Sequence, residues 1–562
     1  MVSLEPRTGP LGLKLSAHLL RRATFGATRK QIDDFANMTA AQAVAELLQA
    51  PEEKAPPPID PLTGSPWIDP ENSVFTAGEG NSGEDELKDV VLGWWLSQMA
   101  KSGMSLSEKM AYFLHTHIPL IQSRIQKSAA LYYHIELLRF YGLGNFKEFS
   151  LKLCLDNAML RHLDGYLNVV GRPQENYARE FMELYTIGKG PQVSSDDYTN
   201  YTELDVQEGA KILSGYGEDT SFRNIDEDTG LAAGVIQGGE WQGDVYVVTS
   251  AKKHDESTKT LSERFQNTVI EPAEIVNGKA TAEAALGELQ QFVDVIFDQE
   301  ETAKHICRKL YRFFVYYKID EEVETGIIAP LAETFRDNDY DFVPVLSQLL
   351  QSQHFYDVDN AELKDNKIGA IIKSPIELVM GMIKFFQVEL PDDQLDYATL
   401  LDGGYSNIMK YMSEQGMSFV EPYEVAGYPA YHQFPVFNRN WISANYLAQR
   451  YKFIEHLLKK SEDDPNSPLL DIVAYVKDTN NISDPFDPDK LVAELVDYLL
   501  PEGVSDERFT YFVNAVLLDN LSVINWQSEW QQYLDSGDDV AVRGQLENLL
   551  KAILQSPESQ LQ

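Results

Sequence analysis

The segment VVLGWWLSQMAKSGMSLSEKMAYFLHTHIPL, residues 90–120, sets the expectation for the whole fold. Its large apolar side chains fall on successive turns at the spacing typical of α-helices: Trp94, Trp95, Met99, Met110 and Phe113. The same spacing continues through residues 131–141 and 146–156, and residues 142–145 separate these two segments as a C-cap and N-cap pair. We therefore predict a mainly α protein.

Helical periodicity extends beyond this segment in both directions. It covers residues 14–48 and resumes near residue 282, from where it continues to residue 386. Between these parts, residues 217–272 contain many Gly, Asp and Thr and one short β-like run, Val245 to Val248. We expect a large multi-helical body that carries a small β-containing insert.

The chain of 562 residues is too long for one compact core, and its length allows about two to four domains. A surface loop rich in Pro, Gly and acidic residues spans residues 50–84, and an acidic run that contains proline marks a linker at residues 461–468. These interruptions predict a helical main domain over residues 1–460, with the insert at about residues 217–272. A helical C-terminal region is expected over residues 465–562.

Acidic residues dominate the charge of the chain. Its 87 Asp and Glu against 47 Lys and Arg give a formal net charge of −40, whereas a nucleic-acid-binding protein needs clustered cations. The most apolar segment, residues 368–390, is a poor membrane span because four charged side chains interrupt it: Lys373, Glu377, Lys384 and Glu389. We expect neither a nucleic-acid partner nor a membrane span.

The two cysteines and the N-terminal residues bear on the compartment. Cys154 and Cys307 each lie in an apolar helical pattern, so we expect no disulfide framework. Residues 1–10 lack the basic and apolar regions of a secretory signal. The default expectation is a cytoplasmic protein, and a removed leader or non-classical export stays open.

His115 and His117 stand one residue apart in an apolar segment, although the chain has only ten histidines. A buried imidazole without a partner is costly, and neutral imidazoles are frequent ligands of divalent metals. On a regular helix the two rings point about 200° apart. Pro119, however, biases Ile118 away from helix, so an unwound end could aim both rings at one ion. We predict metal ligation, with simple hydrogen bonding in the core as the alternative.

A second set of candidate ligands lies on the predicted helix that starts near Asn176. Asn176, Glu180 and Glu183 fall at i, i+4 and i+7 and follow one border of that helix. Its carboxylates repel one another unless a cation lies between them, which Arg179 can provide for Glu175 or Glu183. We predict two metal ligands, Glu180 and Glu183, and three further binding residues: Asn176, Arg179 and Glu175. A salt-bridged helix edge is the equally open alternative.

His254 and Asp255 follow the β-like run on a predicted loop, where binding and catalytic groups are frequent. With the imidazoles and carboxylates above, His254 would complete a mixed nitrogen and oxygen shell for zinc, manganese or iron. A metal with an open position lowers the pKa of bound water, and Asp255 or Glu180 would then act as general base. These residues predict a metal-dependent, hydrolytic enzyme.

Two further segments indicate weaker candidate sites. Residues 224–230 alternate like a calcium loop, but no glutamate closes the loop at Val235, so we reject an EF-hand and leave a looser calcium site open. Aromatic residues near residue 430 could line a sugar-binding groove or simply pack a loop: Tyr423, Tyr428, Tyr431, Phe434, Phe437 and Trp441. Loop packing is the favoured interpretation.

Two other histidines and several missing motifs reduce the number of possible functions. His305 shares a helix face with Arg308 and Arg312, and we interpret it as a hydrogen-bonded core histidine. His18, beside two arginines, is interpreted in the same way, with anion binding as its alternative. The chain has no Walker-type phosphate loop, no dinucleotide-binding glycine motif and no serine-hydrolase elbow.

Several long motifs occur in order along the chain. They include HLLRRATFG at residues 18–26, HTH at 115–117, NYAREFMELYTIG at 176–188, KLYRFFV at 309–315 and KSPIEL at 373–378. On these motifs the chain resembles the uncharacterised bacterial family catalogued as domain of unknown function 1800, over nearly its whole length. The resemblance implies no settled activity, but family members are often encoded beside a sulfatase-like or phosphatase-like protein.

The sequence leaves two functions open. The first is a metal-dependent, hydrolytic enzyme with five candidate ligands: His115, His117, Glu180, Glu183 and His254. The second is a non-catalytic structural or assembly protein that self-associates or partners a sulfatase-like enzyme encoded nearby. In that case the same residues would form a buried ion-pair network.

Overall fold

The computed structural model describes residues 2–50, 54–69, 74–78, 80–194, 197–243, 245–247, 251–272, 275–276, 279–357, 370–391, 404–459, 468–501 and 503–562. Helices dominate these residues, and the strands form only two-stranded antiparallel sheets. The prediction of a mainly α fold is confirmed.

Three short helices open the chain: α1 (Gly12–Ala23), α2 (Arg29–Ala36) and α3 (Ala40–Leu47). Thr28 and Thr39 begin α2 and α3 with capping boxes, in which the threonine and the glutamine three residues later satisfy free N–H groups at the helix start. The guanidinium of Arg22 on α1 donates to the carbonyl oxygens of Phe314 and Gln562, both at 3.0 Å. This buried arginine joins segments that lie far apart in the sequence.

The segment from residue 84 to residue 162, on which the helical prediction rests, is largely buried. Its helices are α4 (Glu84–Lys101), α5 (Ser107–His117), α6 (Ser128–Tyr141), α7 (Phe146–Leu153) and α8 (Asn157–His162). Asn145 begins α7 as predicted, since its side-chain oxygen accepts from the N–H of Glu148 at 2.9 Å. Helix α5 ends at His117 because Pro119 disfavours helical backbone at Ile118.

The acidic helix is shorter than predicted. Helix α9 covers only Asn176–Glu180, and a π-helix, η3 (Phe181–Tyr185), continues it. In a π-helix the hydrogen bonds run from i to i+5, so Glu183 does not follow the α-helical border on which Glu180 lies. The next helix, α10 (Glu203–Ile212), starts with the capping box at Thr202 and Asp205 that the sequence indicated.

The expected β-containing insert is a series of short hairpins. Its paired strands are β7 (Tyr216–Gly217) with β8 (Val235–Ile236), β9 (Glu240–Gln242) with β10 (Val245–Val247), β11 (Lys259–Thr260) with β12 (Val269–Ile270), and β13 (Ile275–Val276) with β14 (Lys279–Ala280). Further hairpins join β1 (Ile59–Asp60) to β2 (Ser65–Pro66), β3 (Ile68–Asp69) to β4 (Val74–Phe75), and β5 (Gln192–Ser194) to β6 (Asp197–Tyr198). A sheet of two strands is too small to form a hydrophobic core of its own.

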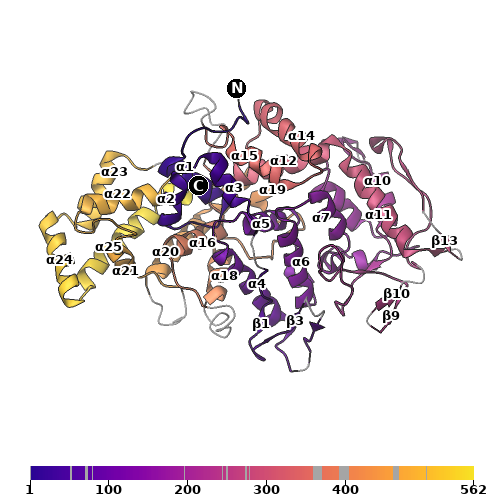
Figure 1. The fold of residues 1–562 in the computed structure, drawn as a ribbon, viewed down its shortest axis with the longest axis horizontal. Helices are drawn as coiled ribbons and strands as arrows, with labels where there is room; N and C mark the ends of the chain where they lie inside the picture. Colours follow the sequence, from indigo (N-terminus) through magenta and orange to yellow (C-terminus); the bar gives the residue numbers. More distant parts are fainter. Residues whose placement is uncertain are drawn as a thin grey trace.

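A second helical block follows the hairpins. It contains α11 (Ala282–Phe297), α12 (Glu300–Phe314), α13 (Glu321–Val323), the π-helix η5 (Glu324–Ile328), α14 (Ala329–Asp337), α15 (Phe342–Gln351), α16 (Pro375–Phe385) and α18 (Tyr405–Glu414). Ser374 and Glu377 form a capping box at the start of α16, with Pro375 in the first helical turn. Helix α12 has a buried stripe and lies beside α14 in the upper part of Figure 1.

The remaining helices are α19 (Pro429–His432), the 3₁₀ helix η7 (Phe437–Trp441), α20 (Ala444–Leu458), α21 (Ile472–Lys477), α22 (Pro488–Leu499), α23 (Asp506–Thr510), the π-helix η8 (Tyr511–Leu517), α24 (Val523–Ser536) and α25 (Val540–Leu554). Most of the predicted linker, residues 461–467, lies outside the described residues. In Figure 1 the helices α21 to α25 gather at the left end, and α10 and α11 lie at the right.

The last residues return to the centre of the molecule. Backbone hydrogen bonds join Ile371 and Gln562 in both directions, at 3.1 and 2.9 Å. Gln562 is buried between α1 and the residues that precede α16. Among the described helices, none combines the length and apolar character needed to cross a membrane.

Candidate functional site

The paired histidines are both buried on α5, but they face different surroundings. His115 is 1% exposed and lies among aromatic rings, with ring centroids 5.7 Å from Trp95 and 6.3 Å from Tyr428. His117 is 5% exposed, bonds the carbonyl oxygen of Tyr185 through Nε2 at 2.9 Å, and has its ring 6.1 Å from that of His305. The helix is not unwound at Thr116, so the two rings point apart as regular helix geometry requires.

Burial keeps both imidazoles neutral. It lowers the pKa of His115 to about 3, with a smaller effect from nearby His134. It also lowers the pKa of His117 to about 3, assisted by the charge of Lys309. Neither ring nitrogen of His115 has a hydrogen-bond partner in the described part of the chain. Both rings are neutral, as metal-binding imidazoles must be. They do not, however, point toward the same place.

The acidic residues near α9 are engaged in ion pairs. Arg179 bonds both carboxylate oxygens of Glu203, at 2.5 and 2.9 Å, and one oxygen of Glu175 at 3.3 Å. Glu183 accepts from Lys189 and from the hydroxyl of Tyr201, both at 3.0 Å. This arrangement is the salt-bridged helix edge that the sequence left open as the alternative.

The two other predicted residues of this helix differ from each other. The side-chain nitrogen of Asn176 donates to the carbonyl oxygen of Leu163 at 3.3 Å, so its amide is used in the fold. Glu180 is half-buried, and burial together with the charge of Glu183 raises the pKa of its carboxyl group. A carboxyl with a raised pKa can serve as an acid or a base, but no described histidine bonds it.

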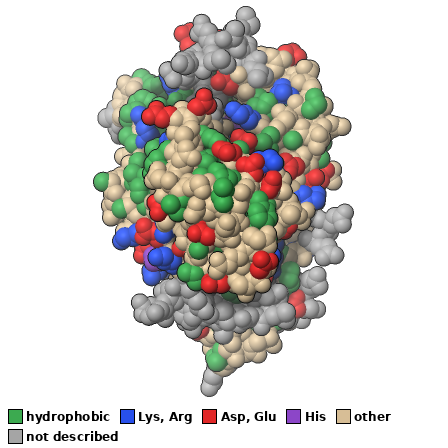
Figure 2. Space-filling view, turned by 90° about the vertical axis from the view of Figure 1, so that its left-hand side faces the viewer, with side chains coloured by type: hydrophobic (Ala, Val, Ile, Leu, Met, Phe, Trp, Pro, Cys, Tyr) green, Lys and Arg blue, Asp and Glu red, His purple; other side chains and the backbone are tan. Residues whose placement is uncertain are grey.

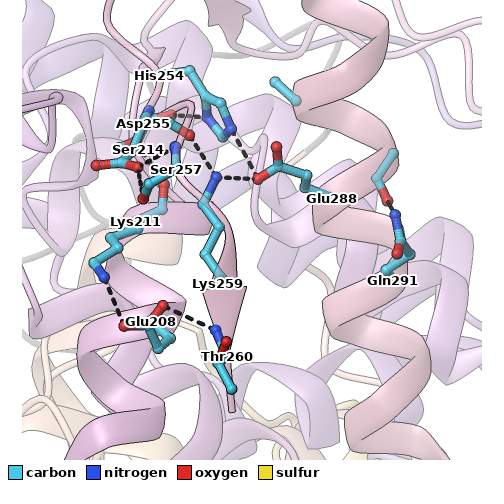
Figure 3. Close-up of polar contacts among 12 residues, drawn as sticks. Glu208, Lys211, Ser214, His254, Asp255, Ser257, Lys259, Thr260, Glu288 and Gln291 are labelled. Carbon is cyan, nitrogen blue, oxygen red and sulfur yellow. Dashed lines mark hydrogen bonds and ion pairs between the residues drawn. The ribbon is translucent and has the colours of Figure 1, made fainter. Parts of the chain in front are cut away.

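His254 lies in a fully buried charged cluster that Figure 3 shows in detail. Its Nδ1 contacts the carbonyl oxygen of Ser214 at 2.8 Å, and its Nε2 contacts the Glu288 carboxylate at 3.2 Å. The Lys259 ammonium donates to the same Glu288 oxygen and to the backbone carbonyl of Asp255. Both ring nitrogens of His254 are therefore occupied by protein groups.

Asp255 points away from that cluster. Its carboxylate accepts from the backbone N–H of Ser257 at 2.9 Å and from the Ser257 hydroxyl. Burial acts to raise the pKa of Asp255, but these hydrogen bonds and the charge of Lys259 outweigh it and lower that pKa. A carboxylate held in this way is a capping group for its own loop.

The predicted ligands do not gather around one point. Among the described residues, no group of three or more His, Cys, Asp or Glu side chains is placed to hold a metal ion. In the segment proposed as a calcium loop, the Lys152 ammonium lies 2.6 Å from Asp226 and 2.5 Å from Asp228 and so takes the place of a cation. Metal binding stays a prediction, and no catalytic step is derived from it.

A site that the sequence did not predict lies beside His117. We name it the Lys309 pocket, a cavity of about 40 Å³ at the meeting point of α5, α12, α16, α19, η7 and the last residues of the chain. Its polar lining is Thr116, His117, Lys309, Arg312, Tyr317, Ser374, Glu377, Tyr431, Asn438 and Gln562, and its apolar lining includes Phe113, Phe313, Phe437 and Trp441. A cavity of this size has room for about three water molecules or one small ion.

Two cations of α12 give this pocket its charge. Lys309 is half-buried, and no described residue forms a hydrogen bond or ion pair with its ammonium. Burial and the nearby charge of Arg312 lower the pKa of Lys309 to about 8. The pKa of Arg312 falls to about 10, because of burial and the charge of Arg308. Both groups keep their positive charge at neutral pH.

Among the described residues that line the pocket, Glu377 is the only carboxylate, and its charge is already neutralised. Glu377 is paired with the Lys109 ammonium at 2.5 Å, and Lys109 also lies 5.4 Å from the ring centroid of Phe313. Burial acts to raise the pKa of Glu377, but the charge of Lys109 outweighs it, and the pKa is lowered. The charges of Lys309 and Arg312 are therefore not balanced within the pocket.

Three of the quoted motifs converge on this pocket. Residues 309–315 provide Lys309, Arg312 and Phe313, the segment 373–378 provides Ser374 and Glu377, and the HTH motif provides Thr116 and His117. The helical spacing of His305, Lys309 and Arg312, at i, i+4 and i+7, was the signal available in the sequence. Sequence reasoning singles out His305, Arg308 and Arg312 on this helix but not Lys309, because an isolated lysine on a helix is usually exposed.

Comparison with known proteins identifies the family and no more. The family model described as "Protein of unknown function (DUF1800)" matches residues 18–561. No curated protein and no solved structure matches the chain.

Proposed function

Because this chain belongs to the DUF1800 family, whose description names no activity, we propose its function from the Lys309 pocket: it binds a small oxyanion there. The observation that carries the proposal is the ammonium of Lys309, which has no hydrogen-bond or ion-pair partner among the described residues and lines the cavity next to the guanidinium of Arg312. A charge partly removed from bulk water without a partner is costly, and a bound anion would offset that cost.

The chemistry of the pocket supports a carboxylate, sulfate or phosphate group. Arginine offers a planar pair of N–H donors to such a group, and lysine adds a point charge. The cavity of about 40 Å³ suits a small ionic head group and not a complete sugar ring. The chain as a whole carries a net charge of −40, so attraction of an anion has to come from this local cluster.

Titration calorimetry tests the proposal. Acetate, sulfate and phosphate are titrated at pH 7 and constant ionic strength into the wild type and Lys309→Met. A charge-assisted hydrogen bond contributes about 1.5–3 kcal/mol, so we expect Lys309→Met to weaken the best anion by about 10- to 100-fold.

Lys304→Met is the matched control. It lies on the same helix and removes the same charge, but Lys304 pairs with Glu300 at 3.0 Å near the surface. Equal affinities for all three proteins, or equal losses in both variants, would contradict the proposal.

A second candidate is self-association, which exposed apolar side chains in the C-terminal helices would favour. Four such side chains lie on η8, in the loop before α24, on α24 and at the start of α25: Tyr511 (55%), Leu521 (52%), Ile524 (70%) and Val540 (78%). Figure 2, which views the end of the molecule that carries α21 to α25, shows hydrophobic side chains scattered among acidic ones on this face. Light scattering tests the idea: a dimer that Ile524→Asp converts to monomer would support it, and a wild-type monomer would contradict it.

The metal-dependent hydrolase stays a prediction from the sequence. The predicted ligands His254 and Glu183 are already bonded to protein partners. Elemental analysis of untagged protein tests it, with near-stoichiometric metal as the supporting result.

A further inference from the structure

Lys309 differs in its surroundings from two other lysines whose pKa burial lowers, Lys373 and Lys384. Burial lowers the pKa of Lys373 to about 7 and that of Lys384 to about 8, close to the value for Lys309. Lys373 donates to the carbonyl oxygen of Ser559 at 2.8 Å, and Lys384 contacts Ser102 at 3.4 Å. Only Lys309, of these three, combines a cavity with an amine that no described residue bonds.

Arg312 is placed to hold a carboxylate next to that amine. Lys309 and Arg312 are three residues apart on α12 and therefore share one face of the helix. The Arg312 guanidinium lies 5.2 Å from the ring centroid of Phe437, and its Nε donates to the carbonyl oxygen of Tyr317 at 3.4 Å. These contacts limit the orientation of the guanidinium, and within the described residues they use one of its N–H groups.

The rest of the wall suits a short carbon chain. Phe113, Phe313 and Trp441 line the cavity, and the rings of Phe313 and Tyr431 stack with centroids 6.0 Å apart. Apolar walls limit water, which otherwise reverses the condensation of an amine with a carbonyl group. A lysine in an apolar pocket next to another cation is an arrangement that makes the amine nucleophilic.

We propose that Lys309 condenses reversibly with the carbonyl group of a short 2-oxo acid whose carboxylate is bound by Arg312. This inference rests on the proposed anion binding and specifies the class of ligand.

The step balances with one proton from solvent. The lone pair of the neutral Lys309 Nζ attacks the C2 carbonyl carbon, a C–N bond forms, the C=O π bond breaks, and the oxygen receives the proton that the amine nitrogen loses. The resulting carbinolamine takes up one proton from solvent, loses this oxygen as water and leaves a protonated imine. The imine draws electrons from C3, so a proton on C3 becomes exchangeable with solvent; nothing is oxidised or reduced.

Reductive trapping tests the proposal directly. The full-length protein is incubated with pyruvate and sodium cyanoborohydride at pH 8, and the modified lysines are located by peptide mass spectrometry. We expect the carboxyethyl adduct on Lys309 to form at least about tenfold faster than on Lys304 or Lys384, because Lys309 alone has both a free amine and a carboxylate-binding neighbour. Excess acetate should slow the labelling of Lys309 and leave that of Lys304 unchanged.

Lys309→Arg separates this proposal from anion binding. The variant keeps a positive charge but cannot form an imine, so we expect it to retain acetate binding and to lose the adduct and any exchange of the pyruvate methyl protons in D₂O. Labelling at equal rates over surface lysines, or pyruvate binding without an adduct on Lys309, would overturn the proposal and leave anion binding in place. Absence of binding by any oxyanion would overturn both.

Discussion

A half-buried ammonium group without a partner lowers stability, and Lys309 has such a group, since no described residue bonds it. In the unfolded chain a lysine has a pKa of about 10.4, whereas burial and Arg312 lower it to about 8 in the fold. Between these two values the unfolded chain binds more protons, so the contribution of Lys309 to the free energy of unfolding rises with pH. Below about pH 8 the folded protein carries the whole destabilising contribution of the charged Lys309.

The first prediction follows from this pH dependence of the free energy of unfolding. Lys309→Met should stabilise the protein at pH 7, by about 1–3 kcal/mol in the absence of bound anion, and the gain should vanish near pH 10. The midpoint of thermal unfolding, measured from pH 6 to pH 10, gives the comparison, with Lys304→Met as control. A destabilised Lys309→Met at pH 7 would show that a partner holds this amine.

The second prediction concerns His115, whose two ring nitrogens have no partner among the described residues. Replacing a buried polar group that lacks hydrogen bonds by an apolar one of similar size is nearly neutral or stabilising. We expect His115→Leu to change the free energy of unfolding by less than about 1 kcal/mol. If His115 instead binds a metal, the variant should lose both metal content and several degrees in its unfolding midpoint.

At the scale of elements, sequence patterns predicted helices well where one periodicity holds. The residues around Trp94 and Trp95 form a helix with a fully buried middle, and the caps at Asn145 and Thr202 lie where they were expected. The acidic helix was predicted as one α-helix, yet it changes to a π-helix at Phe181. Two carbonyl groups near its end bond histidines: that of Tyr185 contacts His117 at 2.9 Å, and that of Leu184 bonds His305. Such tertiary contacts leave no local signature in a sequence.

The cluster of Figure 3 connects two elements through charge. The Glu288 carboxylate on α11 contacts both the His254 ring and the Lys259 ammonium, and all three side chains are fully buried. Breaking a buried pair leaves an unpaired charge and costs about 3–5 kcal/mol. The sequence left open a buried ion-pair network among the candidate ligands themselves, whereas His254 and Lys259 both contact Glu288, which was not among those candidates.

The third prediction tests that cluster. Glu288→Gln should destabilise the protein by about 3–5 kcal/mol, because Lys259 loses its counter-charge, whereas Glu283→Gln on the exposed side of α11 should cost less than about 1 kcal/mol. Adding Lys259→Met to Glu288→Gln should recover part of the loss. Denaturant unfolding of the four proteins measures these values, and an unaffected Glu288→Gln would contradict them.

At the scale of the whole molecule, the sequence predicted the class of fold but not the site. Spacing along a helix is local, so the stripe of His305, Lys309 and Arg312 was visible. The Lys309 pocket, in contrast, is closed by residues from 113 to 562, whose meeting depends on how α5, α12 and α16 pack. The predicted metal ligands do not lie together, because their positions also depend on how the helices pack. His254 contacts Glu288 on α11, whereas His115 lies among aromatic rings near α4 and α19.

Anion binding in the Lys309 pocket depends on one local concentration of positive charge inside a strongly acidic protein. Anomalous diffraction from crystals soaked in selenate locates a bound oxyanion without assuming where it lies. We expect a selenium peak within about 4 Å of Lys309 Nζ, the reach of a charge-assisted contact, that is absent in Lys309→Met crystals soaked in the same way. Selenium peaks confined to surface lysines, with none in the Lys309 pocket, would contradict it.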